Sequence, residues 1–240
     1  MEKNIPKQIL LLLIMTTALV FTSIPCACFT NPEKPLSDDC ITRFDTGTVN
    51  WTTGKVTAVG KASPAGKSRA AKESVSLFAR ADAVKNIIDA LGQIKINNGL
   101  SVYEYAAEKN VILAGLEKTA REAIVSKQVY TSALAVEITI ETSIFGGFLQ
   151  LILPEEIRQI PKINPEINPK AVPEIGKSRY SGLIIDARGL GIEPVLDPVI
   201  ISEQGHEIYS SAFISREFAV QRGVCKYVCN LDHAQRDERT

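Results

Sequence analysis

Residues 54–62 read Gly-Lys-Val-Thr-Ala-Val-Gly-Lys-Ala, and the character of their side chains alternates. One set of alternate positions is apolar and small: Val56, Ala58, Gly60 and Ala62. A period of two is typical of a β-strand whose faces lie in different environments. Because one face carries only small side chains, we predict a strand on which a helix packs closely.

That helix is expected directly after the strand, over Ala65 to Leu91. One stripe recurs at alternating spacings of four and three residues: Ala70, Ser74, Leu77, Ala81, Val84, Ile88 and Leu91. Such spacing is typical of the buried side of an amphipathic helix. Gly92 follows, and glycine is favoured where a helix ends in left-handed backbone. We predict that the helix stops at Gly92 and buries this stripe against the strand.

The next segments predict a second helix between Val102 and Ala123 and two strands, Ile124 to Tyr130 and Leu134 to Ile144. In the last strand apolar residues alternate with glutamate, threonine and serine, which indicates one buried and one wet face. Residues 40–154 are therefore predicted to form an α+β domain, an antiparallel sheet with helices on one face.

Three stretches resemble the lipoprotein-20 family: the run at 54–62, the helical Ala79-Arg-Ala-Asp-Ala-Val-Lys-Asn and the strand Val136-Glu-Ile-Thr-Ile. The resemblance covers Val49 to Pro154. This family comprises small exported bacterial lipoproteins, some of which belong to outer-membrane structures around the flagellar motor. The resemblance implies a structural module without enzymatic activity at the outer membrane. Its pattern of small and apolar residues contains no catalytic signature.

The first 28 residues have the composition of a secretory signal peptide. Lys3 and Lys7 precede Ile9 to Ile24, a mostly apolar run without a charge. The run is shorter than the ~20 residues that a membrane span needs. We therefore expect export to the periplasm or the outer membrane, with an uncleaved anchor as the alternative.

Two cysteines at the end of this signal are candidates for lipidation, since a bacterial lipoprotein is cut just before the cysteine that carries the lipid. Cys28 follows the small residue Ala27, whereas Cys26 follows Pro25, which makes Cys28 the better candidate. Several buried acyl chains would give a stable membrane anchor. Plain cleavage to a periplasmic protein stays open.

The composition is balanced and favours a folded protein. Lysine plus arginine and aspartate plus glutamate number 27 each, so no overall field attracts nucleic acid. With 45% apolar residues the chain can bury a substantial core.

Prolines divide the chain. Pro161, Pro165, Pro169 and Pro173 recur every four residues. Each fixes its own backbone and disfavours helix at the preceding residue. We predict a proline-rich linker over residues 155–180, followed by a small, mostly β module over 181–240.

The second module opens on an apolar run, Leu183 to Ile185, followed by Asp186, Arg188 and the turn Gly189-Leu-Gly191. The preferred interpretation is a core strand with a local pair between Asp186 and Arg188. A zinc amidase would need a histidine where Arg188 stands, and the chain has only two histidines. We also predict a hairpin of Val199 to Ser202 with Glu207 to Tyr209.

Cys225, Cys229 and His233 stand at four-residue intervals, which on a helix would suggest a metal site. Because Gly223 to Val228 looks like a strand, we expect no metal there. A disulfide between Cys225 and Cys229 needs a turn, and Cys40 is the other available partner. The charged end from Gln235 is either a solvated tail or an early stop that exposes a strand edge.

We therefore expect an exported cell-envelope protein at the periplasmic face of the outer membrane, with a structural or assembly role. Association with the motility apparatus is implied by the resemblance alone. Expected partners are the membrane, through a lipid anchor, other envelope proteins and further copies of the chain. We expect no catalytic centre, cofactor or metal. The alternative is a periplasmic envelope hydrolase or ligand-binding protein with a site near Asp186 to Gly191.

Overall fold

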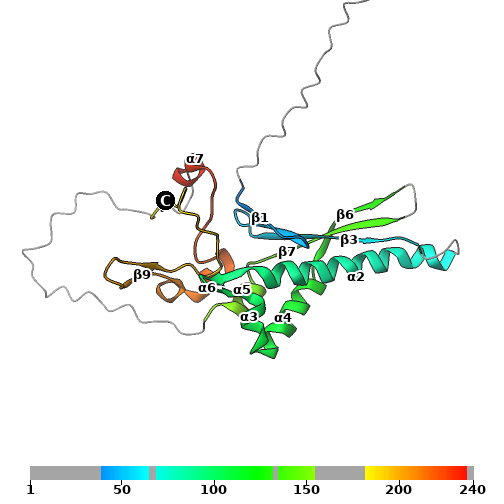
Figure 1. Cartoon of the computed structure of the whole chain (residues 1–240), viewed down its shortest axis with the longest axis horizontal. Coiled ribbons are helices and arrows are strands. Elements are labelled where there is room, and N and C mark those ends of the chain that lie inside the picture. Colours follow the sequence, from blue (N-terminus) through cyan, green and yellow to red (C-terminus); the bar gives the residue numbers. More distant parts are fainter. Residues whose placement is uncertain (1–38, 65–68, 132–134, 155–181, 237–240) are drawn as a thin grey trace, which may run out of the picture. The chain divides into compact units, whose positions relative to one another are not determined.

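The computed structural model describes residues 39–64, 69–131, 135–154 and 182–236 (Figure 1). Five antiparallel strands form the main sheet, in the order β1-β2-β3-β7-β6. Their bounds are Ile41–Arg43 for β1, Gly47–Asn50 for β2, Lys55–Ala62 for β3, Ile124–Tyr130 for β6 and Val136–Ser143 for β7. Helix α2, Arg69–Gln93, covers one face. The predicted α+β fold is confirmed, including the antiparallel sheet, the helices and a small β module near the C-terminus.

The small face of β3 receives α2, as the alternation in residues 54–62 predicted. Val56 and Ala58 are buried on this face. A Cβ atom placed on Gly60 would lie 2.1 Å from the Ala83 nitrogen and 2.2 Å from the Ala79 carbonyl oxygen. The helix backbone therefore lies directly against Gly60, where a side chain would not fit.

The predicted buried stripe of this helix is wrong in register. Ala81 is exposed and Leu77 is 70% exposed. The buried positions of α2 are instead Val75, Ala79, Ala83, Ile87, Ala90 and Leu91. Both stripes have helical spacing, but only the second brings alanines against Gly60, where α2 and β3 approach most closely.

The predicted end of α2 at Gly92 is also wrong, because the helix continues to Gln93. Gly92 is buried, and a Cβ atom there would lie 2.3 Å from a ring carbon of Tyr103. Glycine at this position leaves room for an aromatic ring and does not provide a left-handed cap.

The predicted second helix is two helices, α3 at Val102–Ala107 and α4 at Asn110–Arg121. A capping box formed by Ser101 and Glu104 begins α3. The short strands β4, Lys95–Asn97, and β5, Leu100–Ser101, lie between α2 and α3. Helix α5, Gly147–Ile152, follows β7 and buries Phe148 and Leu149.

The sheet face away from α2 is polar, as predicted for the last strand. Glu141 pairs with Lys55 at 3.2 Å, and Glu137 pairs with Lys61 at 3.0 Å. On the opposite side of β7, Val136, Ile138 and Ile140 are buried. The two faces of β7 therefore differ as the sequence pattern indicated.

The C-terminal segment contains β8, Ile200–Ile201, and β9, Glu207–Tyr209, which form the predicted hairpin. The 3-10 helix η1, Ser211–Phe213, and the helices α6, Arg216–Arg222, and α7, Leu231–Gln235, follow. Two predicted strands are not formed, Leu183 to Ile185 and Gly223 to Val228. The first has no strand partner among the described residues, and Gly223 instead ends α6 with a positive φ of 80°.

The C-terminal segment packs onto the α+β part, and Asp38–Thr240 forms one compact unit. The Leu196 amide donates to the Lys95 carbonyl at 3.0 Å, and the Asp197 amide donates to the Ile96 carbonyl at 2.8 Å. Arg216 donates to the Leu153 carbonyl at 2.9 Å. Among the described residues, no helix is both long and apolar enough to cross a membrane.

Several predictions concern residues outside the described ones. These are the signal peptide over 1–28 with Cys26 and Cys28, the linker over 155–180, and the last residues of the chain. They stay predictions, as does the division of the chain into two domains.

Candidate functional site

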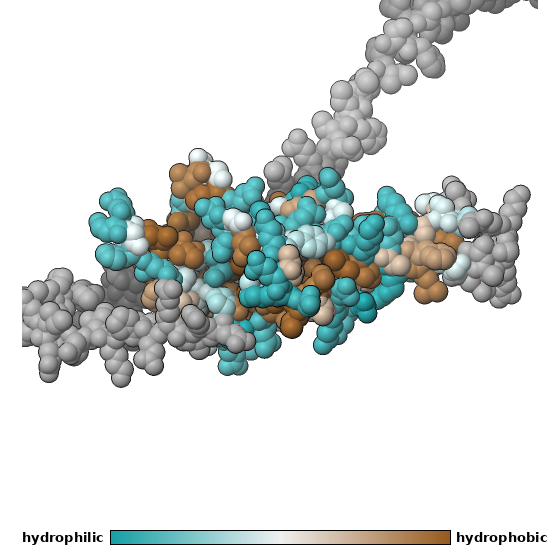
Figure 2. All heavy atoms as spheres, turned by 60° about the horizontal axis from the view of Figure 1, so that its bottom comes forward, coloured by the Kyte–Doolittle hydropathy of each residue, from teal (hydrophilic) through white to brown (hydrophobic). Residues whose placement is uncertain are grey.

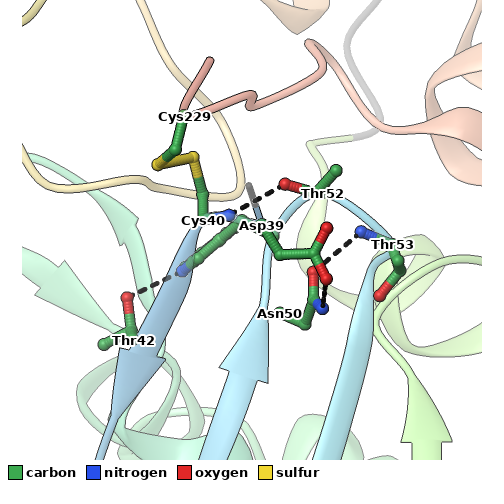
Figure 3. Close-up of a disulfide and its surroundings, with 8 residues drawn as sticks. Asp39, Cys40, Thr42, Asn50, Thr52, Thr53 and Cys229 are labelled. Atoms are coloured by element: carbon green, nitrogen blue, oxygen red, sulfur yellow. Dashed lines mark hydrogen bonds between the residues drawn. A yellow bond between two sulfur atoms is a disulfide. The ribbon is translucent and has the colours of Figure 1, made fainter. Parts of the chain in front are cut away.

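A disulfide between Cys40 and Cys229 joins the beginning of the sheet to the C-terminal segment (Figure 3). The two Cα atoms lie 5.2 Å apart, and 189 positions separate the residues in sequence. The predicted Cys225–Cys229 pairing is therefore wrong, and Cys40, the other partner considered, is used. Cys225 stays outside the disulfide. The choice depends on how the C-terminal segment packs, which spacing between cysteines does not reveal.

Hydrogen bonds fix the backbone around this disulfide (Figure 3). The Cys40 amide donates to the Thr52 hydroxyl at 2.9 Å, and the Trp51 indole N–H donates to the Thr42 hydroxyl at 2.8 Å. The Asn50 side chain donates to Asp39 at 2.9 Å. Cys40 is therefore held in place by the turn that follows β2.

Tyr227 provides a second attachment between the two parts. Its ring meets Trp51 edge to face, with centroids 5.5 Å apart. Its hydroxyl donates to the Val195 carbonyl at 2.9 Å and accepts from the Val195 amide at 3.1 Å. Burial raises the pKa of Tyr227, and Cys225 adds to this shift. The phenol therefore stays neutral and acts as a structural hydrogen-bonding group.

A small hollow lies between these parts, lined by apolar residues that include Trp51, Phe145, Leu149 and Val224. Its volume is about 20 Å³. That volume has room for about one water molecule. The hollow is too small for an organic substrate, so it is a packing feature of the attachment.

The Asp186 to Gly191 turn, the alternative candidate site, holds a local ion pair. Arg188 donates to the two carboxylate oxygens of Asp186 at 2.8 and 2.6 Å, which confirms the predicted pair. Hydrogen bonds from the Arg188 side chain and backbone lower the pKa of Asp186 to about 2. A carboxylate held ionised in this way is a weak base at neutral pH.

The two histidines belong to other elements, His206 to the β8–β9 hairpin and His233 to α7. No group of three or more histidine, cysteine or acidic side chains that could hold a metal occurs among the described residues. Within the described part of the chain, Cys225, Cys229 and His233 therefore do not belong to a metal-binding group of this kind.

Asp197 is a more buried carboxylate, and no sequence pattern marks it out. Burial raises its pKa, and the hydrogen bond from Ser211 opposes that shift. The Ser211 amide donates to its Oδ1 at 3.3 Å. Asp197 joins the C-terminal segment to β4 through its backbone, so we assign it a structural role.

The most distinctive property of the C-terminal module is its exposed apolar surface. Large apolar side chains are exposed at Leu183, Ile184, Ile185, Leu190, Ile192, Val199, Ile201 and Ile208. Exposed apolar side chains that lie together in a contiguous patch often mark a site of interaction. Sequence reasoning assigned the first three to a core strand and so missed this surface.

A second exposed apolar set lies on β6, the last strand of the main sheet. All seven of its residues are exposed. They include Ile124, Val125, Val129 and Tyr130. In Figure 2 apolar residues reach the surface in several places on the face that is shown. Both sets leave large apolar side chains in contact with solvent.

One family model matches the C-terminal end of the chain. The family model for the second domain of Treponema pallidum Tp0624 matches residues 182–240. No curated protein matches the chain. The C-terminal segment is therefore similar to a domain that occurs within another protein.

Proposed function

We propose that this chain is an exported cell-envelope protein with a structural or assembly role, held at the outer membrane as a lipoprotein. Its function is to bind other envelope proteins, for example those of the motility apparatus. This proposal combines the N-terminal signal, the resemblance of Val49 to Pro154 to the lipoprotein-20 family and the surfaces described above.

The single observation that carries an assembly role is the exposed apolar surface of the C-terminal module. Leu183 is 71% exposed, Ile185 is 56% exposed and Leu190 is 67% exposed. Each buried apolar side chain contributes about 1.5–3 kcal/mol relative to the exposed state. Covering several of them with a partner would release a large part of that free energy.

The disulfide is compatible with the proposed export. Disulfides persist in oxidising compartments such as the periplasm and are rare in reducing ones. The Cys40–Cys229 bond also holds the C-terminal module against the sheet, so the exposed surface is presented by a fixed scaffold.

The assembly role is tested by the double substitution Leu183→Ser and Ile185→Ser. Val111→Ser is the matched control, because Val111 is 74% exposed but lies on α4. We expect the double variant to fold with wild-type stability yet to leave the envelope complexes on sedimentation, whereas the control stays with them. Wild-type sedimentation of the double variant would contradict the proposal.

Anchoring is tested separately through the lipidation candidates. We expect Cys28→Ser to move the protein from the membrane to the periplasmic fraction, and Cys26→Ser to leave it on the membrane. Release by neither substitution would rule out a lipid anchor at these cysteines.

A further inference from the structure

Strand β6 forms one edge of the main sheet and has a neighbour on one side only. It pairs with β7, and no described strand lies on its other side. Its seven residues are all exposed. The unpaired N–H and C=O groups of an exposed strand edge can pair with another chain, although Lys127 and the register irregularity between Val125 and Lys127 oppose indiscriminate pairing.

The hydrogen-bond pattern identifies which backbone groups face outward. The Thr131 amide, just after β6, donates to the Ala135 carbonyl at 2.9 Å. In an antiparallel pair, backbone groups of successive residues point alternately to the two edges. The backbone amide and carbonyl groups of Lys127 and Val129 therefore point toward β7. Those of Gln128 and Tyr130 point to the open edge.

The side chains of β6 divide between the two faces of the sheet. Tyr130 is paired with Val136, and Val125 with Ile140, so these two side chains lie on the face covered by α2. They are 68% and 42% exposed, respectively, and offer apolar contacts to an added strand. Lys127 is paired with Thr139, on the opposite, polar face.

Lys127 gives this edge a positive charge. No ion pair of Lys127 is found among the described residues, and Glu137 and Glu141 on β7 are already paired with Lys61 and Lys55. Opposite charges facing each other across strands stabilise a pair, and like charges destabilise it. An added strand with an acidic residue facing Lys127 would therefore be favoured.

The same charge disfavours a second copy of the chain as the added strand. Antiparallel pairing of two β6 strands about their centre would place Lys127 against Lys127. The other edge of the sheet, β1, is three residues long and ends in Arg43, which again carries a positive charge. Neither arrangement offers Lys127 an acidic neighbour.

We propose that the β6 edge binds an extended segment of a different protein by strand addition, with an acidic residue facing Lys127 and apolar residues beside Val125 and Tyr130. Main-chain hydrogen bonds to Gln128 and Tyr130 provide the affinity, and the charge and the apolar contacts provide selectivity. The inference rests on the proposed assembly role and names the chemistry of one partner.

The test uses a fluorescent peptide and the purified protein. The peptide is Val-Thr-Val-Glu-Val-Thr-Val, which places its glutamate on the same face as threonine, and its matched partner has lysine instead of glutamate. We expect binding of the glutamate peptide, and roughly fivefold weaker binding of the lysine peptide. Lys127→Glu should reverse this order.

Backbone pairing is tested with Gln128→Pro, which removes an outward amide without removing a bond to β7. Gln128→Ala is the matched control, because it removes the same side chain but keeps the amide. We expect the proline variant to lose binding and the alanine variant to retain it. If Gln128→Pro does not fold, Tyr130→Pro and Tyr130→Ala make the same comparison.

Four outcomes would overturn the proposal: no binding of either peptide, equal binding of both, binding that survives the proline substitution, or self-association of the protein that the proline abolishes. The last would assign the edge to a second copy. Because the assay needs no membrane, failure here leaves the sedimentation test of the C-terminal surface unaffected.

Discussion

Substitution of Gly60 by alanine tests the central contact of the fold, the approach of α2 to β3. The new Cβ atom would lie 2.1 Å from the Ala83 nitrogen and 2.2 Å from the Ala79 carbonyl oxygen, whereas ordinary contact begins at 3.4 Å. Because both neighbours are backbone atoms, rotation of a side chain cannot relieve the overlap. The helix must move away from the sheet by more than 1 Å.

The expected cost follows from two opposing effects. Overpacking of a core typically costs about 1–3 kcal/mol, and this backbone overlap belongs at the upper end. Replacing glycine in a strand interior recovers about 0.5–1 kcal/mol of backbone entropy. We therefore expect Gly60→Ala to lower the free energy of unfolding by about 2 kcal/mol, and Tm by roughly 4–8 °C for a unit of this size.

Denaturant unfolding measures this difference, with Gly147→Ala as the control. Gly147 begins α5, its φ is not in the left-handed region, and a Cβ atom there would meet nothing within 4 Å. We expect the control to be neutral or slightly stabilising, since alanine is the better helix former. Equal stability of Gly60→Ala and wild type would refute the close packing of α2 on β3.

Further predictions concern other parts of the molecule. Ala81→Leu should change the free energy of unfolding by less than about 0.5 kcal/mol, because Ala81 is exposed. A large loss of stability would show that Ala81 is buried, as the stripe predicted from the sequence required. Cys40→Ser should lower stability by about 2–5 kcal/mol and abolish the effect of reductant on unfolding, because the bond to Cys229 is lost. Asp197→Asn should be more stable than wild type at pH 7, because burial raises the pKa of Asp197 and the folded protein then holds a disfavoured charge. This stability advantage of the variant should disappear as the pH falls to the ordinary aspartate pKa of about 3.9. If the advantage persists at that pH, ionisation of Asp197 is not its cause. Asp186→Asn should leave the cellular phenotype unchanged, whereas loss of phenotype with normal stability and membrane association would favour the hydrolase or ligand-binding alternative.

The strands of the main sheet could be predicted because their local pattern and their tertiary environment agree. The alternation in β3 and β7 reflects one face against α2 and one face in water. The register of α2 could not be predicted, because two stripes share the helical spacing. The choice between them depends on Gly60, which is distant in sequence from most of the helix and allows close approach only to the alanine stripe.

The C-terminal module shows why an apolar run is insufficient to predict a strand. Leu183 to Ile185 has strand-forming residues, but a strand also needs a neighbour for its backbone, and no described segment supplies one.

The disulfide partner of Cys229 likewise could not be predicted from the sequence, because it depends on tertiary packing. Three cysteines were available, and only the packing of Tyr227 on Trp51 and of Leu196 on β4 brings Cys229 to Cys40.

The central claim, an exported protein that is anchored in the envelope, is tested most directly by the intact mass of the protein purified from its native cells. The account predicts a chain that begins at Cys28, carries acyl groups and contains the Cys40–Cys229 disulfide, so that alkylation without reductant modifies neither of these two cysteines. An uncleaved chain of 26.2 kDa whose five cysteines all react with the alkylating reagent would contradict it.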